Sequence, residues 1–352
     1  MPLYAHVTGW GKYVPEAVLT NDDLATFLDT SDEWIRQHTG IRERRIATGD
    51  ETVATMSAKA ARAALAVAGL TAQDLDLIIM STSSPDRQLP GAAPLLQAEL
   101  GATQAAAFDM RSGCSGFIYA LSIARQFVAC GTYRRVLVVG AEVVSRYLDW
   151  SDRRTCVLFG DGAGAAIVEG SETPGGVLFT AMGTQGQDYE ALTVRAGGSA
   201  YPVCPRTVSL GYHHIEMDGQ RTASFALRTL LRRANQAVEG AGLTWDEIDL
   251  FIPHQANLRL IELTAEKLHV PMARMFVNVD RYANMSTASV PVALAEAAES
   301  GRIEPGDRVL LLAFGAGLAW GTAVIEWGTR GGANGAPGPW RRLSQRLRTG
   351  WV

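Results

Sequence analysis

Residues 68–79 read AGLTAQDLDLII, and residues 241–252 read AGLTWDEIDLFI, which is nearly the same pattern. A second match, RVL followed by two aliphatic residues, begins at Arg135 and again at Arg308. Both pairs have the same offset of 173 residues (241 − 68 and 308 − 135). We therefore interpret the chain as a duplication of one unit of about 170 residues, not as a short-period repeat. Chance likeness between two helix–turn–strand joints is the alternative, and the shared offset argues against it.

Around these matches, short apolar runs alternate with longer stretches of helical spacing. The runs predict strands at 75–81, 105–109, 135–141, 163–169, 248–252, 308–314 and 319–327. Helical spacing predicts helices at 52–68, 116–129, 222–239, 257–268 and 289–300. Several strands are apolar throughout, as expected where helices cover both faces of a sheet. The pattern predicts an α/β fold of βαβ units, with one half in residues 1–172 and the other in 173–330.

Composition excludes several classes of protein. A net charge of −4 provides no positive field for nucleic acid, so no nucleic-acid partner is expected. No apolar run reaches the roughly 18 residues of a membrane span, and no secretory signal is visible. The four cysteines lack CxxC spacing, which favours reduced thiols and a cytoplasmic location. Residues 331–352 are expected to form a flexible basic tail; a short amphipathic helix that contacts a membrane or an acidic partner is the alternative.

Cys114 is the candidate nucleophile. It lies in SGCSG, between a predicted strand and the helix predicted at 116–129. The free N–H groups and partial positive charge of a helix N-terminus favour a thiolate there. An inert buried cysteine is the alternative, and it is the preferred interpretation for Cys130 and Cys156. Cys204 has no helper residue nearby in the sequence.

Two polar residues of the second half are candidate partners. His254 follows a predicted strand and precedes a helix, a setting suited to acid–base or hydrogen-bonding work. Asn284, in YANMSTAS, could cap the next helix or donate its amide to a substrate carbonyl. The glycine-rich turn at 314–321 could aim a backbone N–H at an oxyanion. Active groups collect beyond the carboxyl ends of strands in open α/β sheets, so two fused halves could bring Cys114, His254 and Asn284 to one pocket.

Together these motifs resemble β-ketoacyl-acyl-carrier-protein synthase III, within the thiolase-like superfamily. The resemblance runs from residue 7 to residue 327. It rests on TSDEWIRQHTGIRERRIA (30–47), CSGFIYAL (114–121), DRRTCVLFGDGAGA (152–165), HQANLR (254–259), the asparagine loop and FGAGLAWG (314–321). It implies a thiolase-like five-layered αβαβα fold of two duplicated halves, usually as a homodimer, with no metal and no cofactor besides the coenzyme A thioester used as substrate.

The implied reaction is a decarboxylative Claisen condensation that starts fatty-acid synthesis. Cys114 would take an acyl group from a short acyl-CoA, and malonyl-acyl carrier protein would bind next. His254 and Asn284 would hydrogen-bond the malonyl thioester and stabilise the enolate left when carbon dioxide departs. The N–H groups of Cys114 and Ala316 would form the oxyanion hole, and Phe314 would lie near the nucleophile.

The resemblance also implies substrate contacts. Trp34 would stack on the adenine of coenzyme A, and the other coenzyme contacts would be Thr30, Arg153, Gly219 and Asn257. Gln255 and Arg259 would receive the acidic carrier protein. Leu89 would line the acyl pocket, where a phenylalanine is common. The chain also departs from the common pattern at His38, Gly113 and Met285, so the acyl starter stays open.

Three other functions are alternatives. A condensing enzyme of specialised metabolism, such as a quinolone- or polyketide-type relative, would keep the fold and nucleophile but use another starter or acceptor. A Cys-His-Asn hydrolase matches in residue types, but the duplicated α/β pattern and the missing papain-type signature argue against it. A non-catalytic acyl-binding protein would have no need for all three polar residues.

Overall fold

The structure is a computed structural model that describes residues 3–328, and it contains two main sheets. The five-stranded sheet has the order β1-β7-β6-β4-β5, and the four-stranded sheet has the order β11-β12-β13-β8. Their strands are β1 (Tyr4–Tyr13), β4 (Leu77–Ser81), β5 (Ala106–Met110), β6 (Arg135–Glu142), β7 (Gly162–Ser171), β8 (Val177–Thr184), β11 (Leu250–Pro253), β12 (Arg308–Gly315) and β13 (Ala319–Glu326). β4 runs parallel to β5 and β6, and β11 runs parallel to β12.

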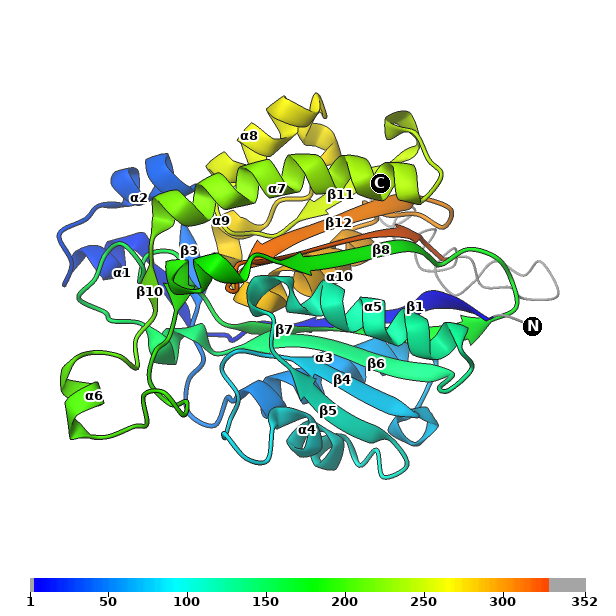
Figure 1. Cartoon of the computed structure of the whole chain (residues 1–352), viewed down its shortest axis with the longest axis horizontal. Helices are drawn as coiled ribbons and strands as arrows, with labels where there is room; N and C mark the ends of the chain where they lie inside the picture. The colour runs from blue at the N-terminus through cyan, green and yellow to red at the C-terminus, as the bar shows by residue number, and fades with distance from the viewer. Residues whose placement is uncertain (1–2, 329–352) are drawn as a thin grey trace, which may run out of the picture.

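Helices separate and cover the sheets in five layers (Figure 1). The larger helices are α3 (Val53–Ala68), α4 (Ala92–Leu100), α5 (Gly116–Ala129), α7 (Gly219–Gly240), α8 (Leu258–Leu268) and α10 (Ser289–Glu299). α3 and α4 cover the outer face of the five-stranded sheet, and α5 and α10 lie between the sheets. α7, with α8 beside it, covers the outer face of the four-stranded sheet. The predicted αβαβα architecture is therefore present.

Strand β4 shows why the strands are apolar throughout. Successive side chains of a strand point to opposite faces. Leu77 and Ile79 belong to the core around α5 and α10, whereas Ile78 and Met80 belong to the core under α3 and α4. Burial of each such side chain contributes about 1.5–3 kcal/mol, so both faces favour this layered arrangement.

The duplication read from the sequence is visible in the topology. The order β1, α3, β4, α5, β6, β7 of the first half is repeated as β8, α7, β11, α10, β12, β13. Gly69 and Gly242 have φ of 70° and 71°, a left-handed conformation that glycine adopts readily; Gly69 caps α3, and Gly242 follows the capping residue of α7. The boundary predicted at residues 172 and 173 falls between β7 and β8, and the predicted tail at 331–352 lies outside the described residues.

Shorter elements fill the connections, most of them at the left end in Figure 1. They form two small antiparallel pairs, β2 with β3 and β9 with β10, and four short helices. Their bounds are β2 (Val18–Thr20), α1 (Asn21–Ala25), α2 (Asp32–Thr39), β3 (Glu43–Arg45), β9 (Leu192–Thr193), α6 (Pro205–Ser209), β10 (Glu216–Met217) and α9 (Val279–Tyr282). No helix among residues 3–328 is long and apolar enough to cross a membrane.

Candidate active site

Cys114 lies in a tight turn between β5 and α5, as predicted. The turn, Gly113–Ser115, is 3-10 helical, and α5 begins directly after it at Gly116. Gly113 has φ of 50°, and a Cβ there would lie 2.7 Å from the Ala316 backbone nitrogen. A Cβ on Gly315 would lie 2.5 Å from the Cys114 nitrogen. The two turns therefore pack backbone against backbone, which brings the N–H group of Ala316 beside the cysteine turn.

The Cys114 side chain lines a cavity of about 290 Å³. The thiol is 5% exposed, and its Sγ donates to Ser286 Oγ over 3.5 Å. The cavity is also lined by Arg111, Glu142, Tyr147, Phe159, Ser286 and Ala316, among others. The predicted nucleophile thus has access to a space of the size needed for a small acyl group.

The resting state of Cys114 differs from the prediction. Burial, reinforced by the charge of Glu142 and opposed by the hydrogen bond to Ser286, raises the pKa of the Cys114 thiol to about 12. The expected preformed thiolate is therefore wrong for the free protein, because the sulfur is desolvated and has a carboxyl group as its charged neighbour. At neutral pH the residue is a thiol and must lose a proton when it reacts.

Asn284 is held by the loop before α10. Its Oδ1 accepts a hydrogen bond from the Ser286 N–H over 2.8 Å, and its backbone N–H donates to the Leu158 carbonyl over 2.9 Å. The residue next to the start of α10 is Ala288, so Asn284 does not cap that helix. Because the amide oxygen is engaged, the NH₂ end is the donor left for a substrate; no acceptor for it occurs in the described part of the chain.

His254 follows β11 directly and is 2% exposed. Its backbone N–H donates to the Leu312 carbonyl over 2.7 Å, and its ring meets the Phe314 ring edge-on with centroids 5.4 Å apart. Burial lowers the pKa of His254 to about 3, so the imidazole is neutral at pH 7. Its Nδ1 is buried and has no hydrogen-bond partner among residues 3–328.

The three predicted residues are connected through their neighbours. Ser286 contacts Cys114 and Asn284, while Phe314, beside Gly315, contacts His254. Neither His254 nor Asn284 lines the Cys114 cavity.

The predicted adenine site forms an aromatic and basic cluster at the surface, where Trp34 is half-buried and His38 and Arg153 are exposed. The Trp34 ring stacks on His38 with centroids 4.4 Å apart, and the Arg153 guanidinium lies 5.1 Å from the Trp34 ring centre. Arg153 also donates to the Asp29 carbonyl over 2.5 Å. Thr30 follows directly, and its Oγ1 is buried without a partner in the described chain. His38, where the sequence departs from the common family pattern, thus stacks on the ring of Trp34.

The remaining predicted coenzyme and carrier contacts sit at helix starts. Gly219 is the first residue of α7. Asn257 caps α8 by accepting from the Arg259 N–H over 2.8 Å, and its amide donates to the His38 carbonyl over 3.1 Å. Arg259 is exposed, and its Nε donates to the Gln37 carbonyl.

The predicted carrier contact of Gln255 is wrong in this structure, and Leu89 does not lie where the prediction placed it within the single chain. Gln255 is fully buried; its amide donates to the Pro253 and Phe276 carbonyls and accepts from the N–H groups of Asn278 and Val279. A side chain with all these groups engaged inside the protein cannot receive a carrier protein. Leu89 is 87% exposed and does not line the Cys114 cavity within the single chain, so its place in an acyl pocket stays a prediction.

Sequence reasoning did not single out Glu142 and Ser286. Glu142 ends strand β6, in which every residue between Arg135 and Glu142 is apolar or glycine, and this lone carboxyl group at the end of a buried strand was an available signal. Ser286 lies two residues after Asn284, within a loop already noted, but nothing in its local sequence indicates a contact with Cys114.

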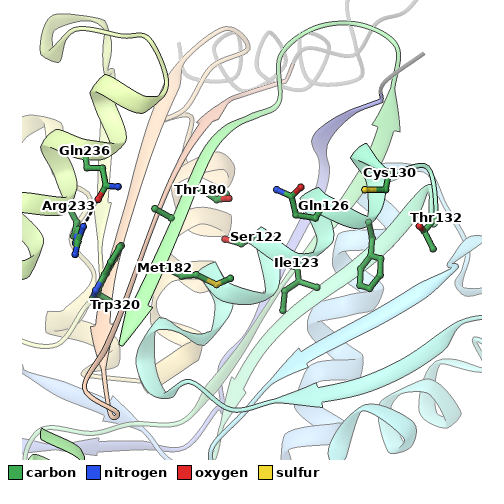
Figure 2. A pocket seen from close by; sticks show the side chains of 12 residues that line it. Ser122, Ile123, Gln126, Cys130, Thr132, Thr180, Met182, Arg233, Gln236 and Trp320 are labelled. Atoms are coloured by element: carbon green, nitrogen blue, oxygen red, sulfur yellow. Dashed lines mark hydrogen bonds between the residues drawn. The ribbon is translucent and has the colours of Figure 1, made fainter. Parts of the chain in front are cut away.

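A second hollow, of about 700 Å³, lies between α5, β8 and α7 (Figure 2). Arg233 and Trp320 lie on one side of it, with the guanidinium 3.9 Å from the ring centre, and Ile123 and Gln126 of α5 lie on the other. None of the predicted site residues lines this hollow.

Comparison with known proteins agrees with this architecture. The profile of the 3-oxoacyl-[acyl-carrier-protein] synthase III family matches residues 108–186, and the profile of the family's C-terminal part matches residues 238–327. The chain is 48% identical over 327 residues to the beta-ketoacyl-[acyl-carrier-protein] synthase III of Roseiflexus sp. (strain RS-1), which covers 93% of this chain and 99% of the relative.

Solved structures agree as well. The crystal structure of 3-oxoacyl-[acyl-carrier-protein] synthase III from Aquifex aeolicus VF5 is 44% identical, with a TM-score of 0.85 over 92% of this chain and 100% of that one. The priming beta-ketosynthase from the R1128 polyketide biosynthetic pathway is 36% identical, with a TM-score of 0.87 over 93% and 97%. Similarity at this level over nearly the full length shows that the chain belongs to the 3-oxoacyl-[acyl-carrier-protein] synthase III family.

Proposed function

We propose that this chain joins a short acyl group from acyl-CoA to malonyl-acyl carrier protein, with loss of carbon dioxide, in the first condensation of fatty-acid synthesis. Family membership makes it an acyl-transferring condensing enzyme. The observation that carries the proposal is the placement of Cys114: a buried thiol at the start of α5, open to a cavity and packed against the Gly315–Ala316 turn.

In the first half-reaction, the Cys114 sulfur attacks the acyl-CoA carbonyl and coenzyme A leaves. The carbonyl oxygen becomes an oxyanion, for which the backbone N–H groups of Cys114 and Ala316 are the proposed donors. Their positions are fixed by the close packing of the two turns, so they need little reorganisation. A donor aimed at such an oxyanion contributes about 3–4 kcal/mol.

In the second half-reaction, His254 and Asn284 are the proposed donors to the malonyl thioester carbonyl. A neutral imidazole can donate one N–H, and the amide oxygen of Asn284 is already engaged by Ser286, which leaves its NH₂ to donate. Hydrogen bonds to this oxygen stabilise the enolate that forms as the carboxylate leaves as carbon dioxide. The enolate carbon then attacks the acyl group on Cys114.

The proposed substrate contacts lie at the surface of the protein. Trp34 and Arg153 offer an aromatic face and a cation for the adenine of coenzyme A. Arg259 is the proposed contact for the acidic carrier protein, mainly through its effect on association rate. A homodimer is supported by apolar groups that a second copy could cover. The edge of β5 is unpaired in the described chain, and Phe108 on that strand is 36% exposed, while the side chain of Leu89 is 87% exposed. Both proposed substrates are cytoplasmic, so we propose that location.

The test is to incubate the protein with acetyl-CoA and branched acyl-CoAs, weigh the intact protein and map the adduct. We expect an acyl increment on Cys114 that is absent in Cys114→Ala, and a ketoacyl product when malonyl-acyl carrier protein is added. An adduct on another residue, or no product from any starter, would refute the proposal.

A specialised starter is the second candidate, because the R1128 priming enzyme matches this fold as well as the fatty-acid enzymes do. An adduct from the starter panel that forms much faster with an unusual acyl-CoA than with acetyl-CoA would favour it.

A further inference from the structure

Glu142 is a buried carboxyl group that the proposed reaction does not yet use. It ends β6, is 1% exposed and lines the same cavity as Cys114. Its oxygens accept hydrogen bonds from the Ser83 N–H (3.1 Å), the Ser84 hydroxyl (2.5 Å) and the Ser286 hydroxyl (3.1 Å). No basic side chain within residues 3–328 forms an ion pair with it. An anion buried without a cation is costly, and this burial raises the pKa of Glu142.

Ser286 connects this carboxyl group to the nucleophile. Cys114 Sγ donates to Ser286 Oγ over 3.5 Å, and the same hydroxyl donates to Glu142 Oε1 over 3.1 Å. The backbone holds the hydroxyl in place: Ser286 has φ of 48°, and its N–H donates to Asn284 Oδ1. Left-handed conformations of non-glycine residues are uncommon and cluster at functional sites. The chain of donors thus has one direction, from sulfur to hydroxyl to carboxylate.

We propose that Ser286 and Glu142 take up the proton of Cys114 during acylation. The sulfur passes its proton to Ser286 Oγ while the Ser286 proton passes to Glu142 Oε1, and the sulfur attacks the acyl-CoA carbonyl. The bond between the acyl carbon and the coenzyme A sulfur then breaks. The proton returns from Glu142 through Ser286 to the departing thiolate, so the products are S-acyl Cys114, coenzyme A thiol and the original carboxylate.

The physical reason for a proton transfer through Ser286 to Glu142 is the negative charge of the site. If Cys114 ionised alone, a second negative charge would form beside Glu142, and that repulsion is part of the reason why the pKa of Cys114 is raised. Through Ser286, one negative charge moves from carboxylate to sulfur and the total charge stays constant. Ser286 touches the reacting sulfur and is a catalytic residue; Glu142 acts through it and is a positioning residue. The inference rests on the proposed function, because it needs acylation of Cys114.

Other titratable groups near the pair are few in the described structure. Arg111 and Tyr147 line the same cavity. Burial, followed by the charge of Glu142, raises the pKa of Tyr147, so it stays neutral in the assay range. His254, on the neighbouring β11 side, is neutral there as well. A titration of the acylation rate between pH 5.5 and 9 is therefore assigned to Glu142.

The experiment measures single-turnover acylation by acetyl-CoA, with rapid quenching and intact-protein mass, from pH 5.5 to 9. For the wild type we expect a rate that rises as Glu142 ionises and then levels. For Glu142→Gln we expect a rate about 10²–10³-fold lower at pH 7, rising about tenfold per pH unit because hydroxide must take the proton. Ser286→Ala should behave likewise, and the double variant should be no slower than the slower single one. Glu51→Gln, which changes a carboxyl group hydrogen-bonded to Tyr13, is the matched control and should keep the wild-type profile.

The sign of the Glu142→Gln effect decides the matter. If the carboxylate only repels the thiolate, its removal lowers the pKa of Cys114 and acylation becomes faster; a rate at pH 7 equal to or above wild type overturns the relay. If Glu142→Gln does not fold, the Ser286→Ala variant decides instead. The relay is overturned if folded Ser286→Ala has the same pH dependence of acylation as the wild type, with a rate that rises and then levels. A wild-type protein that forms no Cys114 adduct refutes the proposed function itself, whereas a normal wild-type adduct with an unaffected Glu142→Gln refutes only the relay.

Discussion

Gln255 provides a sharp test, because the sequence resemblance makes it a contact for the carrier protein, whereas the structure makes it a buried hydrogen-bonding residue. We consider Gln255→Met, which keeps the volume of the side chain and removes its amide. The change leaves the buried N–H groups of Asn278 and Val279 without their acceptor, at 2.9 and 3.2 Å in the native protein. Each orphaned buried donor costs about 1–3 kcal/mol, so the free energy of unfolding should fall by about 2–6 kcal/mol.

The assay pairs thermal unfolding with steady-state kinetics. We expect the Tm of Gln255→Met to fall by on the order of 10 °C, and the KM for malonyl-acyl carrier protein, measured below that Tm, to change less than about twofold. Arg259→Ala is the matched control: its side chain is exposed, so the Tm should hold while the KM rises with a marked salt dependence. A Gln255→Met protein with native Tm and a tenfold higher KM would refute this reasoning and restore the carrier-contact assignment.

Three further variants test other parts of the site. Asn284→Asp keeps an acceptor for the Ser286 N–H but loses the amide donor, so the acyl adduct should still form while condensation falls at least about 10²-fold; equal loss of both steps, measured by intact mass and product formation, would contradict the assigned role. Trp34→Ala should raise the KM for acyl-CoA about tenfold through lost stacking, with Tm unchanged because the ring is only partly buried; an unaltered KM would argue against the adenine site. Because the pKa of His254 is lowered in the folded protein, the unfolded chain binds more protons than the folded chain below about pH 6.5. The stability from this group is therefore full above pH 6.5 and decreases as pH falls toward 3, by about 2–3 kcal/mol at pH 4.5. Urea unfolding at pH 7 and 4.5 should show a smaller acid-induced loss in His254→Gln than in wild type, and equal losses would show that His254 is not buried as a neutral group.

The sequence predicted the elements well where local chemistry decides them. Helix α5 has the predicted bounds, 116–129, and the other predicted helices and strands begin and end within three residues of the observed ones. β1, α4 and β8 were missed. β1 and β8 mix polar and small residues with apolar ones, so their periodicity is weak, and α4 contains Pro94 within nine residues.

The sequence by itself determined the duplicated α/β architecture and the turn in which the proposed nucleophile lies. Apolar periodicity, capping residues and left-handed glycines act within a few neighbours along the chain, so they can be read without coordinates. The glycines that follow α3 and α7 repeat at the same offset, and the small residues around Cys114 mark the turn that holds it.

Only the tertiary structure decided which polar groups meet and what charge they carry. Glu142 and Ser286 are 144 residues apart in the chain, and the contacts of Ser286 with both Glu142 and Cys114 exist because the two halves pack together. Burial likewise turns the expected thiolate into a thiol, since the cost of desolvating a charge depends on every atom around it, not on the neighbours in the sequence. The same reason places Gln255 inside the protein, against what its motif indicated.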